Sequence, residues 1–158
     1  MINYNKKVMK YFLKPKNAGK IKNADGIGKV GNIQCGDIMY LFIKISKNKK
    51  NQEIIKDIKF ETLGCPAAIA SSSVVTELAK NKTLDEAIKI TNRDVVKVLG
   101  NLPPIKYHCS LLAEEALTEA IYDYYKKQKR KIPKKIEEKH KRILTLKKEF
   151  EKKFKKSK

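Results

Sequence analysis

The chain has 158 residues, which is the length of a single domain with one modest core. Its composition, 41% hydrophobic and 34% charged, is that of a globular protein, and no apolar run approaches the roughly 20 residues that span a bilayer. The net charge of +20 invites a nucleic-acid interpretation, but residues 126–158 alone hold 17 Lys and Arg against 4 Asp and Glu. Most of the charge therefore belongs to a tail, and the body is only moderately basic.

The beginning of the sequence and the cysteines indicate an intracellular compartment. The first residues lack the apolar stretch of a signal peptide, so we expect a cytoplasmic location. Three cysteines are an odd number and too few for a disulfide framework. In a reducing compartment, such thiols are buried apolar side chains, metal ligands or nucleophiles, and their positions must decide between these.

The first half of the chain predicts one helix and a hairpin. Residues 4–13 form a short amphipathic pattern that Pro15 ends, and residues 25–28 have the composition of a turn. Residues 38–45 are dense in strand-forming side chains, and residues 54–62 alternate between apolar and polar ones. A polar turn joins these two runs, which predicts an antiparallel hairpin.

The second half predicts helices. Pro66 opens a helix that extends to Ala79, and Thr83 and Thr91 begin two short ones. Residues 101–105 contain two prolines and predict an extended, helix-free connection. Ser110 is then the expected N-cap of a long helix with apolar residues at helical spacing. Strands followed by helices indicate an α+β fold, with the helices packed on one face of a small antiparallel sheet.

After this helix the composition changes. Residues 127–158 form a basic, helical extension in which Ile136, Ile143, Leu146, Phe150 and Phe154 lie near one face and lysine fills most of the other. We therefore expect one domain over residues 1–126 and an appended helix over residues 127–158. On this lysine-rich helix His140 is expected at the surface. The extension is either a solubilising segment, a docking helix for an acidic partner, or a surface for RNA or membranes.

Each cysteine lies at a predicted junction between elements. Cys35 precedes a strand, Cys65 lies between a strand and a helix start, and Cys109 comes just before the last helix of the body. A helix N-terminus favours the thiolate, which is the metal-binding form. Asp37 and His108 stand close by in the sequence. If the junctions converge, the soft sulfurs would select an iron–sulfur cluster or zinc, and four such ligands could form a tetrahedral site.

Two other classes of protein remain open at this point. A zinc protein would use the same residues in a closed site. A thiol enzyme would pair His108 with Cys109, but catalytic pairs meet in space and are seldom neighbours in the sequence. Visible absorption separates these classes, because a cluster colours the protein and zinc or a bare thiol does not.

Three motifs, in this order and spacing, resemble the signature of the IscU and NifU N-terminal scaffold family. They are Cys-Gly-Asp at residues 35–37, Gly-Cys-Pro-Ala-Ala-Ile-Ala-Ser-Ser-Ser at 64–73, and Leu-Pro-Pro-Ile-Lys-Tyr-His-Cys-Ser at 102–110. The resemblance covers residues 2–126. It implies a small three-stranded antiparallel sheet with helices on one face and the ligand residues clustered at one end. It also implies a scaffold without turnover of its own, which assembles a labile 2Fe–2S cluster and transfers it to apo-proteins.

The resemblance also implies roles for single residues. Cys35, Cys65 and Cys109 would bind the cluster, with Asp37 or His108 as the fourth ligand, and Asp37 would keep the cluster transferable. Cys109, and as a second candidate Cys65, would accept sulfur from a cysteine desulfurase. A further segment would contact an Hsp70-type chaperone; it consists of Leu102, Pro103, Pro104, Ile105 and Lys106.

The cofactors and partners follow from the same resemblance. We expect iron and a 2Fe–2S cluster, with zinc in the apo form. The expected partners are a cysteine desulfurase, an electron donor such as a ferredoxin, recipient apo-proteins, an Hsp70-type chaperone and a second copy that shares the cluster. We do not expect nucleic acid as a partner of the body, because it carries no aromatic stacking motif.

Overall fold

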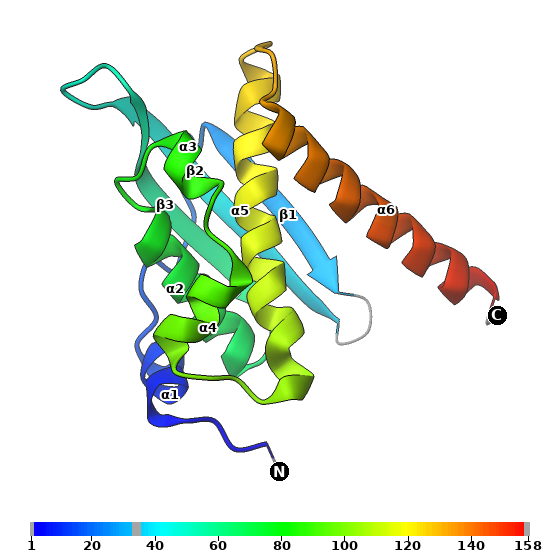
Figure 1. Cartoon of the computed structure of the whole chain (residues 1–158). Coiled ribbons are helices and arrows are strands. Elements are labelled where there is room, and N and C mark those ends of the chain that lie inside the picture. Colours follow the sequence, from blue (N-terminus) through cyan, green and yellow to red (C-terminus); the bar gives the residue numbers. More distant parts are fainter. Residues whose placement is uncertain (1, 33–35, 157–158) are drawn as a thin grey trace.

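The computed structural model describes residues 2–32 and 36–156. Its strands are β1 (Gly26–Asn32), β2 (Asp37–Lys47) and β3 (Glu53–Leu63). Its helices are α1 (Lys6–Leu13), α2 (Pro66–Ala79), α3 (Leu84–Ala87), α4 (Asn92–Leu99), the 3-10 turn η1 (Pro104–Lys106), α5 (Tyr107–Lys127) and α6 (Lys134–Lys156). The helices lie on one face of the sheet (Figure 1), which confirms the predicted α+β class.

The sheet is antiparallel in the order β1-β2-β3, and β2 and β3 form the predicted hairpin. The prediction of a turn at residues 25–28 is wrong, because β1 already begins at Gly26. The cause is the close approach of α5. A Cβ atom on Gly26 or Gly28 would collide with the carbonyl oxygens of Ala120 and Ala116. These glycines are therefore strand residues that let a helix backbone pack directly on the sheet.

The core lies between the sheet and the helices α2 and α5. Helix α2 is buried on nearly all sides, because α1, α4, α5 and β3 all pack against it. Its run of small residues makes this possible, since Ala67, Ala68 and Ser71 have no exposed surface. Helix α5 crosses the sheet along β1 and β2. Its N-terminus and that of α2 are thereby brought close to the start of β2, as the contacts of the next section show.

Two predictions about the entry into α5 are wrong. The helix begins at Tyr107, so Ser110 is buried in its first turns and is no N-cap. The Ser110 hydroxyl instead donates a hydrogen bond of 2.7 Å to the Tyr107 carbonyl oxygen. The connection before α5 is not free of helix either, because Pro104–Lys106 form a 3-10 turn. A proline in the first position of that turn needs no hydrogen-bonded N–H, which is why the sequence allows it.

Helix α6 packs on α5 with its first half and leaves the body with its second (Figure 1). Ile136 is 1% exposed, and the His140 ring stacks on the Tyr122 ring with 3.6 Å between the centroids. His140 is therefore half-buried against α5, whereas the sequence predicts a surface residue. In the described part of the chain, no helix is long and apolar enough to cross a membrane.

Candidate metal centre

The elements carry the predicted ligand residues to one end of the molecule. Asp37 is the first residue of β2, Cys65 is the N-cap of α2, and His108 and Cys109 lie in the first turn of α5. Asp37 is 5% exposed and Cys109 is fully buried, whereas Cys65 and His108 are partly exposed. Cys35, which the sequence predicts as a further ligand, lies outside the described residues.

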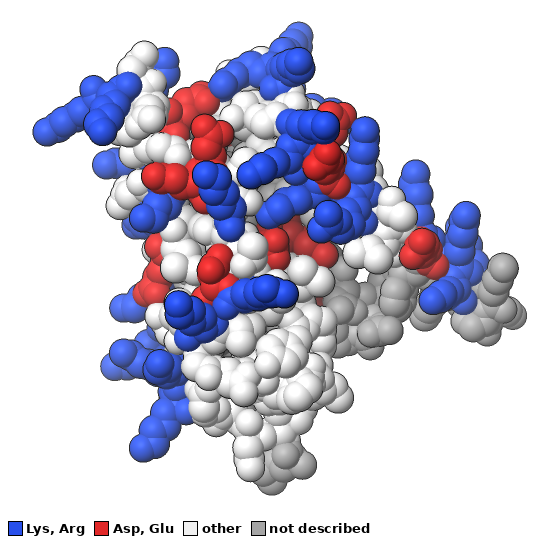
Figure 2. All heavy atoms as spheres, in the orientation of Figure 1, with Lys and Arg blue, Asp and Glu red and all other residues white. Residues whose placement is uncertain are grey.

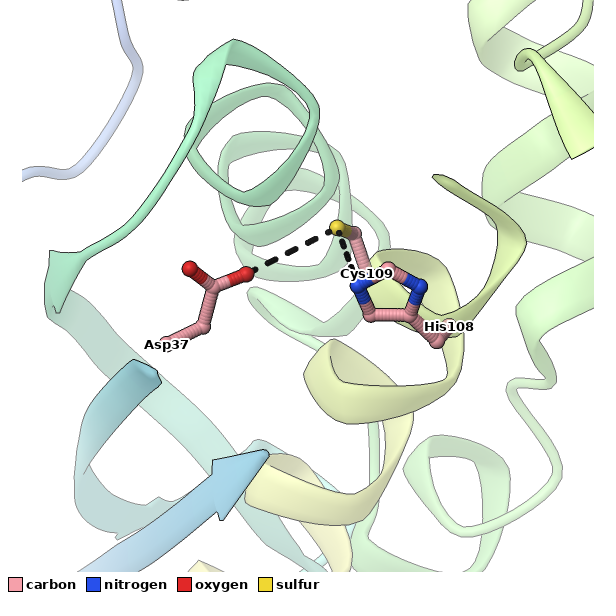
Figure 3. Close-up of side chains that lie close together, drawn as sticks. All are labelled: Asp37, His108 and Cys109. Atoms are coloured by element: carbon pink, nitrogen blue, oxygen red, sulfur yellow. Dashed lines mark hydrogen bonds between the residues drawn. The ribbon is translucent and has the colours of Figure 1, made fainter. Parts of the chain in front are cut away.

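Cys109 lies at the centre of this group (Figure 3). Its Sγ atom is 3.8 Å from Asp37 Oδ2 and 3.5 Å from His108 Nε2. The Cys65 Sγ atom lies 3.6 Å from the same sulfur. One donor atom each of Asp37, His108 and Cys109 lie within 4.8 Å of one another, a spacing that a single metal ion can bridge. One sulfur, an imidazole and a carboxylate therefore meet within reach of one ion, and the Cys65 sulfur lies beside the Cys109 sulfur.

The pKa values of the two thiols shift in opposite directions. The pKa of Cys65 is lowered to about 5, first because the Cys109 thiol donates a hydrogen bond to it, and further because of the Ala68 N–H and the Lys106 ammonium. These effects outweigh burial, which acts in the opposite direction. The pKa of Cys109 is raised, first by the hydrogen bond between its thiol and Cys65. Burial of the Cys109 side chain and the negative charges of Cys65 and Asp37 raise it further. Of the two described cysteines, Cys65 shows the lowered pKa expected at a helix N-terminus and Cys109 does not.

Gly64 has a role that the sequence does not reveal. Glycine near the ligands suggests backbone freedom, and Gly36, with a φ of +70°, does adopt a left-handed conformation. Gly64 is different. A Cβ atom there would lie 2.8 Å from the Ala68 Cβ atom and 3.3 Å from the Asp37 carboxyl group. Gly64 is therefore small so that the Asp37 carboxyl group can approach the start of α2.

Two further side chains lie beside the sulfur pair. Burial and the negative charge of Cys65 raise the pKa of Tyr4. Burial alone would lower the pKa of Lys106, but the negative charges of Cys65 and Tyr4 raise it. Lys106 is predicted above only as part of a chaperone contact. Tyr4 belongs to no sequence motif, so only the folded structure could reveal that it lies beside Cys65 and Cys109.

The surface around the site is less charged than the rest. In the view of Figure 2, the lower middle of the molecule, near the start of α5 in Figure 1, is mostly uncharged, whereas Lys and Arg side chains gather at the lower left beside α1. Exposed apolar side chains of this region are Ile105 (69% exposed), Tyr107 and Leu111. In the segment predicted to contact a chaperone, Leu102 is 2% exposed and belongs to the core. Ile105 is the apolar residue of that segment that a partner can reach.

Comparison with known proteins places the chain in a family. The NifU-like N terminal domain matches residues 3–131. The iron-sulfur cluster assembly scaffold protein IscU 1 of Archaeoglobus fulgidus is 53% identical over 124 residues, which are 78% of each chain. The IscU scaffold protein of Aquifex aeolicus is 46% identical over 127 residues, which are 80% of this chain and 79% of that one.

A solved structure agrees with the fold. The N-terminal part of a NifU-like protein from Brucella abortus has a TM-score of 0.63 at 18% identity, covering 78% of this chain and 94% of the other. At this identity the likeness concerns the fold alone. The family match and the identity to the two relatives, both well above what chance similarity gives, carry the assignment. The chain belongs to the family of the NifU-like N terminal domain.

Proposed function

We propose that the protein is a scaffold on which an iron–sulfur cluster is assembled and from which it is passed to apo-proteins. The grouping of Cys65, Cys109, Asp37 and His108 at one end of the fold carries this proposal. Family membership supports it, because relatives at 46% and 53% identity are named as such scaffolds. The cluster is the cargo of the protein, and a scaffold needs no turnover of its own.

The proposed cargo is a 2Fe–2S cluster with three thiolate ligands. Cys35, Cys65 and Cys109 would supply the sulfurs, and either Asp37 or His108 would be the fourth ligand. Both lie close to Cys109, at 3.8 and 3.5 Å, so the distances favour neither. A carboxylate is a harder and therefore poorer ligand for such a cluster than a thiolate. Asp37 as a ligand would keep the cluster easy to release.

Sulfur would arrive as a persulfide on a cysteine desulfurase. A scaffold thiolate attacks the outer sulfur, a new S–S bond forms, and the desulfurase cysteine leaves as a thiolate. We propose Cys109 as the acceptor and Cys65 as the second candidate. Cys109 is fully buried, whereas Cys65 is partly exposed and has the lowered pKa. The two are close enough for sulfur to pass from one to the other.

The remaining proposed partners follow from this chemistry. Reduction of each persulfide sulfur to sulfide consumes two electrons, so an electron donor such as a ferredoxin is needed. Recipient apo-proteins take the finished cluster, and an Hsp70-type chaperone would bind the segment that contains the exposed Ile105. A second copy would share the cluster in a dimer. We propose the cytoplasm as the compartment, since thiols that are kept free to bind a cluster need reducing conditions.

Anaerobic reconstitution with ferrous iron and sulfide tests the cargo. Wild type should gain visible absorption with matched iron and sulfide, and Cys35→Ser, Cys65→Ser and Cys109→Ser should each lose it. Glu61→Gln, an exposed pair with Lys20, is the control and should behave as wild type. A colourless wild-type protein that binds zinc through the same cysteines would contradict the proposal.

Asp37→Ala tests release separately from assembly. We expect this variant to hold its cluster but to pass it to an apo-ferredoxin about tenfold more slowly, because the hard ligand is lost. The rate of transfer is followed by circular dichroism of the recipient's cluster. Transfer as fast as in wild type would show that Asp37 has no part in release.

Zinc is a second candidate occupant, and one observation favours it. Cys109, His108 and Asp37 offer three ligand atoms spaced for one zinc ion, and Cys65, whose sulfur lies 3.6 Å from that of Cys109, could supply the fourth. We propose that zinc occupies this set in the apo form. Metal analysis of protein purified without added iron should find up to one zinc per chain, and Cys109→Ser should lose it.

A further inference from the structure

The first half of α6 shows what kind of surface this helix recognises. Ile136 is buried against α5. Beside it, the Lys139 ammonium lies 3.2 Å from a Glu114 carboxylate oxygen, and His140 Nδ1 lies 2.8 Å from one of Glu119. An apolar side chain flanked by basic ones thus packs on a helix that offers glutamates at matching positions.

The second half of α6 carries a related pattern, in which Leu146 takes the place of Lys139. Seven residues make two helical turns, so Ile143, Leu146 and Lys147 follow Ile136, Lys139 and His140 on the same face. Ile143 is half-buried, whereas Leu146 is 49% exposed and Lys147 is exposed. Phe150 and Lys153 continue the spacing in the sequence. We call Ile143, Leu146, Lys147 and Lys153 the outer seam.

The outer seam lies on the same face of α6 as Ile136, Lys139 and His140, but there the helix diverges from the body. The positive charge of Lys147 still lowers the pKa of Glu119, although burial dominates there and raises it. Figure 1 shows α6 diverging from α5 along its length, with its C-terminal turns away from the other helices. The pattern that docks the first half is therefore presented to solvent by the second.

The width and charge of the outer seam select its partner. Helices that lie in a bilayer surface need a broad apolar face, whereas a stripe of one or two apolar residues per heptad is the seam of a helix pair. Lysines flank this stripe, and flanking positions of helix pairs favour opposite charges on the partner. A second copy of this chain, with a net charge of +20, would place lysine against lysine. An acidic amphipathic helix fits on both counts.

We propose that the outer seam of α6 binds an amphipathic helix of a partner protein, whose apolar stripe is flanked by Glu or Asp. Such a helix would continue along α6 the kind of contact that α5 makes with Ile136, Lys139 and His140. Exposed ion pairs contribute little each, so the apolar side chains Ile143 and Leu146 must supply much of the affinity, and the lysines the choice of partner. The proposal does not depend on the cargo of the metal centre.

Fluorescence anisotropy with the full-length protein tests this. The probe is a labelled three-heptad peptide with leucine in the seam positions and glutamate beside them, and its twin carries glutamine in place of glutamate. We expect the glutamate peptide to bind at least about tenfold more tightly than the glutamine peptide, and to weaken as salt is added. Absence of binding, or equal binding of both peptides, would overturn the proposal.

A matched pair of variants locates the binding face. Lys147→Glu with Lys153→Glu reverses two outer-seam charges, whereas Lys148→Glu with Lys152→Glu makes the same change of net charge on the roughly opposite face. The first pair should weaken binding by about tenfold or more, and the second by less than about twofold. Both must retain the helix content and melting temperature of wild type.

The other occupants are distinguishable outcomes. Phosphate contacts to RNA are not confined to one helix face, so both variant pairs would weaken the binding of an RNA oligonucleotide equally. Tighter binding of such an oligonucleotide, or of vesicles with phosphatidylserine, than of the glutamate peptide would overturn the proposal. Self-association through α6 would also overturn the proposal. It would appear in sedimentation velocity as a dimer whose population changes in the variant with Lys147→Glu and Lys153→Glu.

Discussion

Gly64 shows how a residue with no side chain can shape a site. Its missing Cβ atom leaves the space into which the Asp37 carboxyl group and the Ala68 methyl group extend. We expect Gly64→Ala to lower the free energy of unfolding by about 1–3 kcal/mol, because the crowding forces Ala68 or Asp37 to move. Cluster yield in reconstitution should fall with it. Denaturant unfolding and iron content provide the two measurements.

Gly31→Ala is the matched control for this change. A Cβ atom at Gly31 would meet only the Asp37 carbonyl oxygen, at 3.5 Å, which is an ordinary contact. Both substitutions add one methyl group near the start of β2, so only the position differs. If the Gly64 variant retained wild-type stability and iron content, the close approach of Asp37 to α2 would not be a requirement of the site.

Glu115 connects residue chemistry with the pH dependence of stability. Burial and the neighbouring charges of Glu114 and Glu119 raise its pKa from 4.5 to about 7. Between these pH values the unfolded chain releases the proton while the folded one retains it. The contribution of Glu115 to the free energy of unfolding is therefore fully present below pH 4.5 and is lost as the pH rises towards 7. We expect Glu115→Gln to stabilise the fold by about 1–2 kcal/mol at pH 8 and to change little at pH 4.

Urea unfolding of both proteins across this pH range measures the difference. Glu61→Gln is the control, because its exposed pair with Lys20 should contribute less than about 1 kcal/mol at any pH. A constant difference between wild type and the Glu115 variant would mean that burial does not hold the proton on this carboxyl group.

The predictions for single residues succeed where a motif fixes the residue type and fail where the fold sets the surroundings. The motifs alone predict that Asp37, His108 and Cys109 share one site, and the folded chain does bring them together. The lysines beside His140 in the sequence predict a surface position for it. Its partners Tyr122 and Glu119, however, belong to another helix. The sequence of α6 by itself does not indicate that this face of the helix packs against α5.

At the scale of elements, β1 depends on a helix almost 90 residues away. Gly28 faces the α5 backbone so closely that a Cβ atom would collide with the Ala116 carbonyl oxygen and the Ala120 nitrogen. We expect Gly28→Ala to destabilise the fold by about 2–4 kcal/mol, since backbone atoms cannot rotate away as a side chain does. Chemical unfolding measures the loss, and again Gly31→Ala on the same strand is the control.

The same contact explains why β1 could not be predicted. Its sequence has glycine at positions 26, 28 and 31, and in isolation glycine-rich segments predict turns. Strands β2 and β3 carry their own signal in apolar side chains, and α2 does so in its proline start. The prediction for the start of α5 fails for a related reason. A serine near a helix start suggests a cap, but Ser110 is buried by the packing of the helix that contains it.

At the scale of the whole molecule, the question is whether α6 is an appendage or a part of the domain. The sequence predicts a division at residue 126, and this division stays a proposal. Two contacts bear on it. Arg130 pairs with Glu53 at 2.7 Å and lies over the Tyr125 ring, and Ile136 is buried against the body. Both contacts come from residues after the proposed boundary.

A substitution at Ile136 decides how strongly the two parts are coupled. If α6 folds together with the body, Ile136→Ala should lower the free energy of unfolding of the whole chain by about 2–4 kcal/mol, because it leaves a cavity at a position that is 1% exposed. Leu146→Ala removes side-chain atoms from the same helix at 49% exposure and should cost less than about 0.5 kcal/mol. Circular dichroism during denaturant unfolding measures both.

One cooperative transition that shifts with Ile136→Ala would make α6 part of the domain, because loss of the α6 contact then destabilises the sheet and the metal centre as well. A body transition unmoved by Ile136→Ala, with α6 melting earlier, would instead establish the boundary near residue 126 and make the docking of α6 a local, reversible contact.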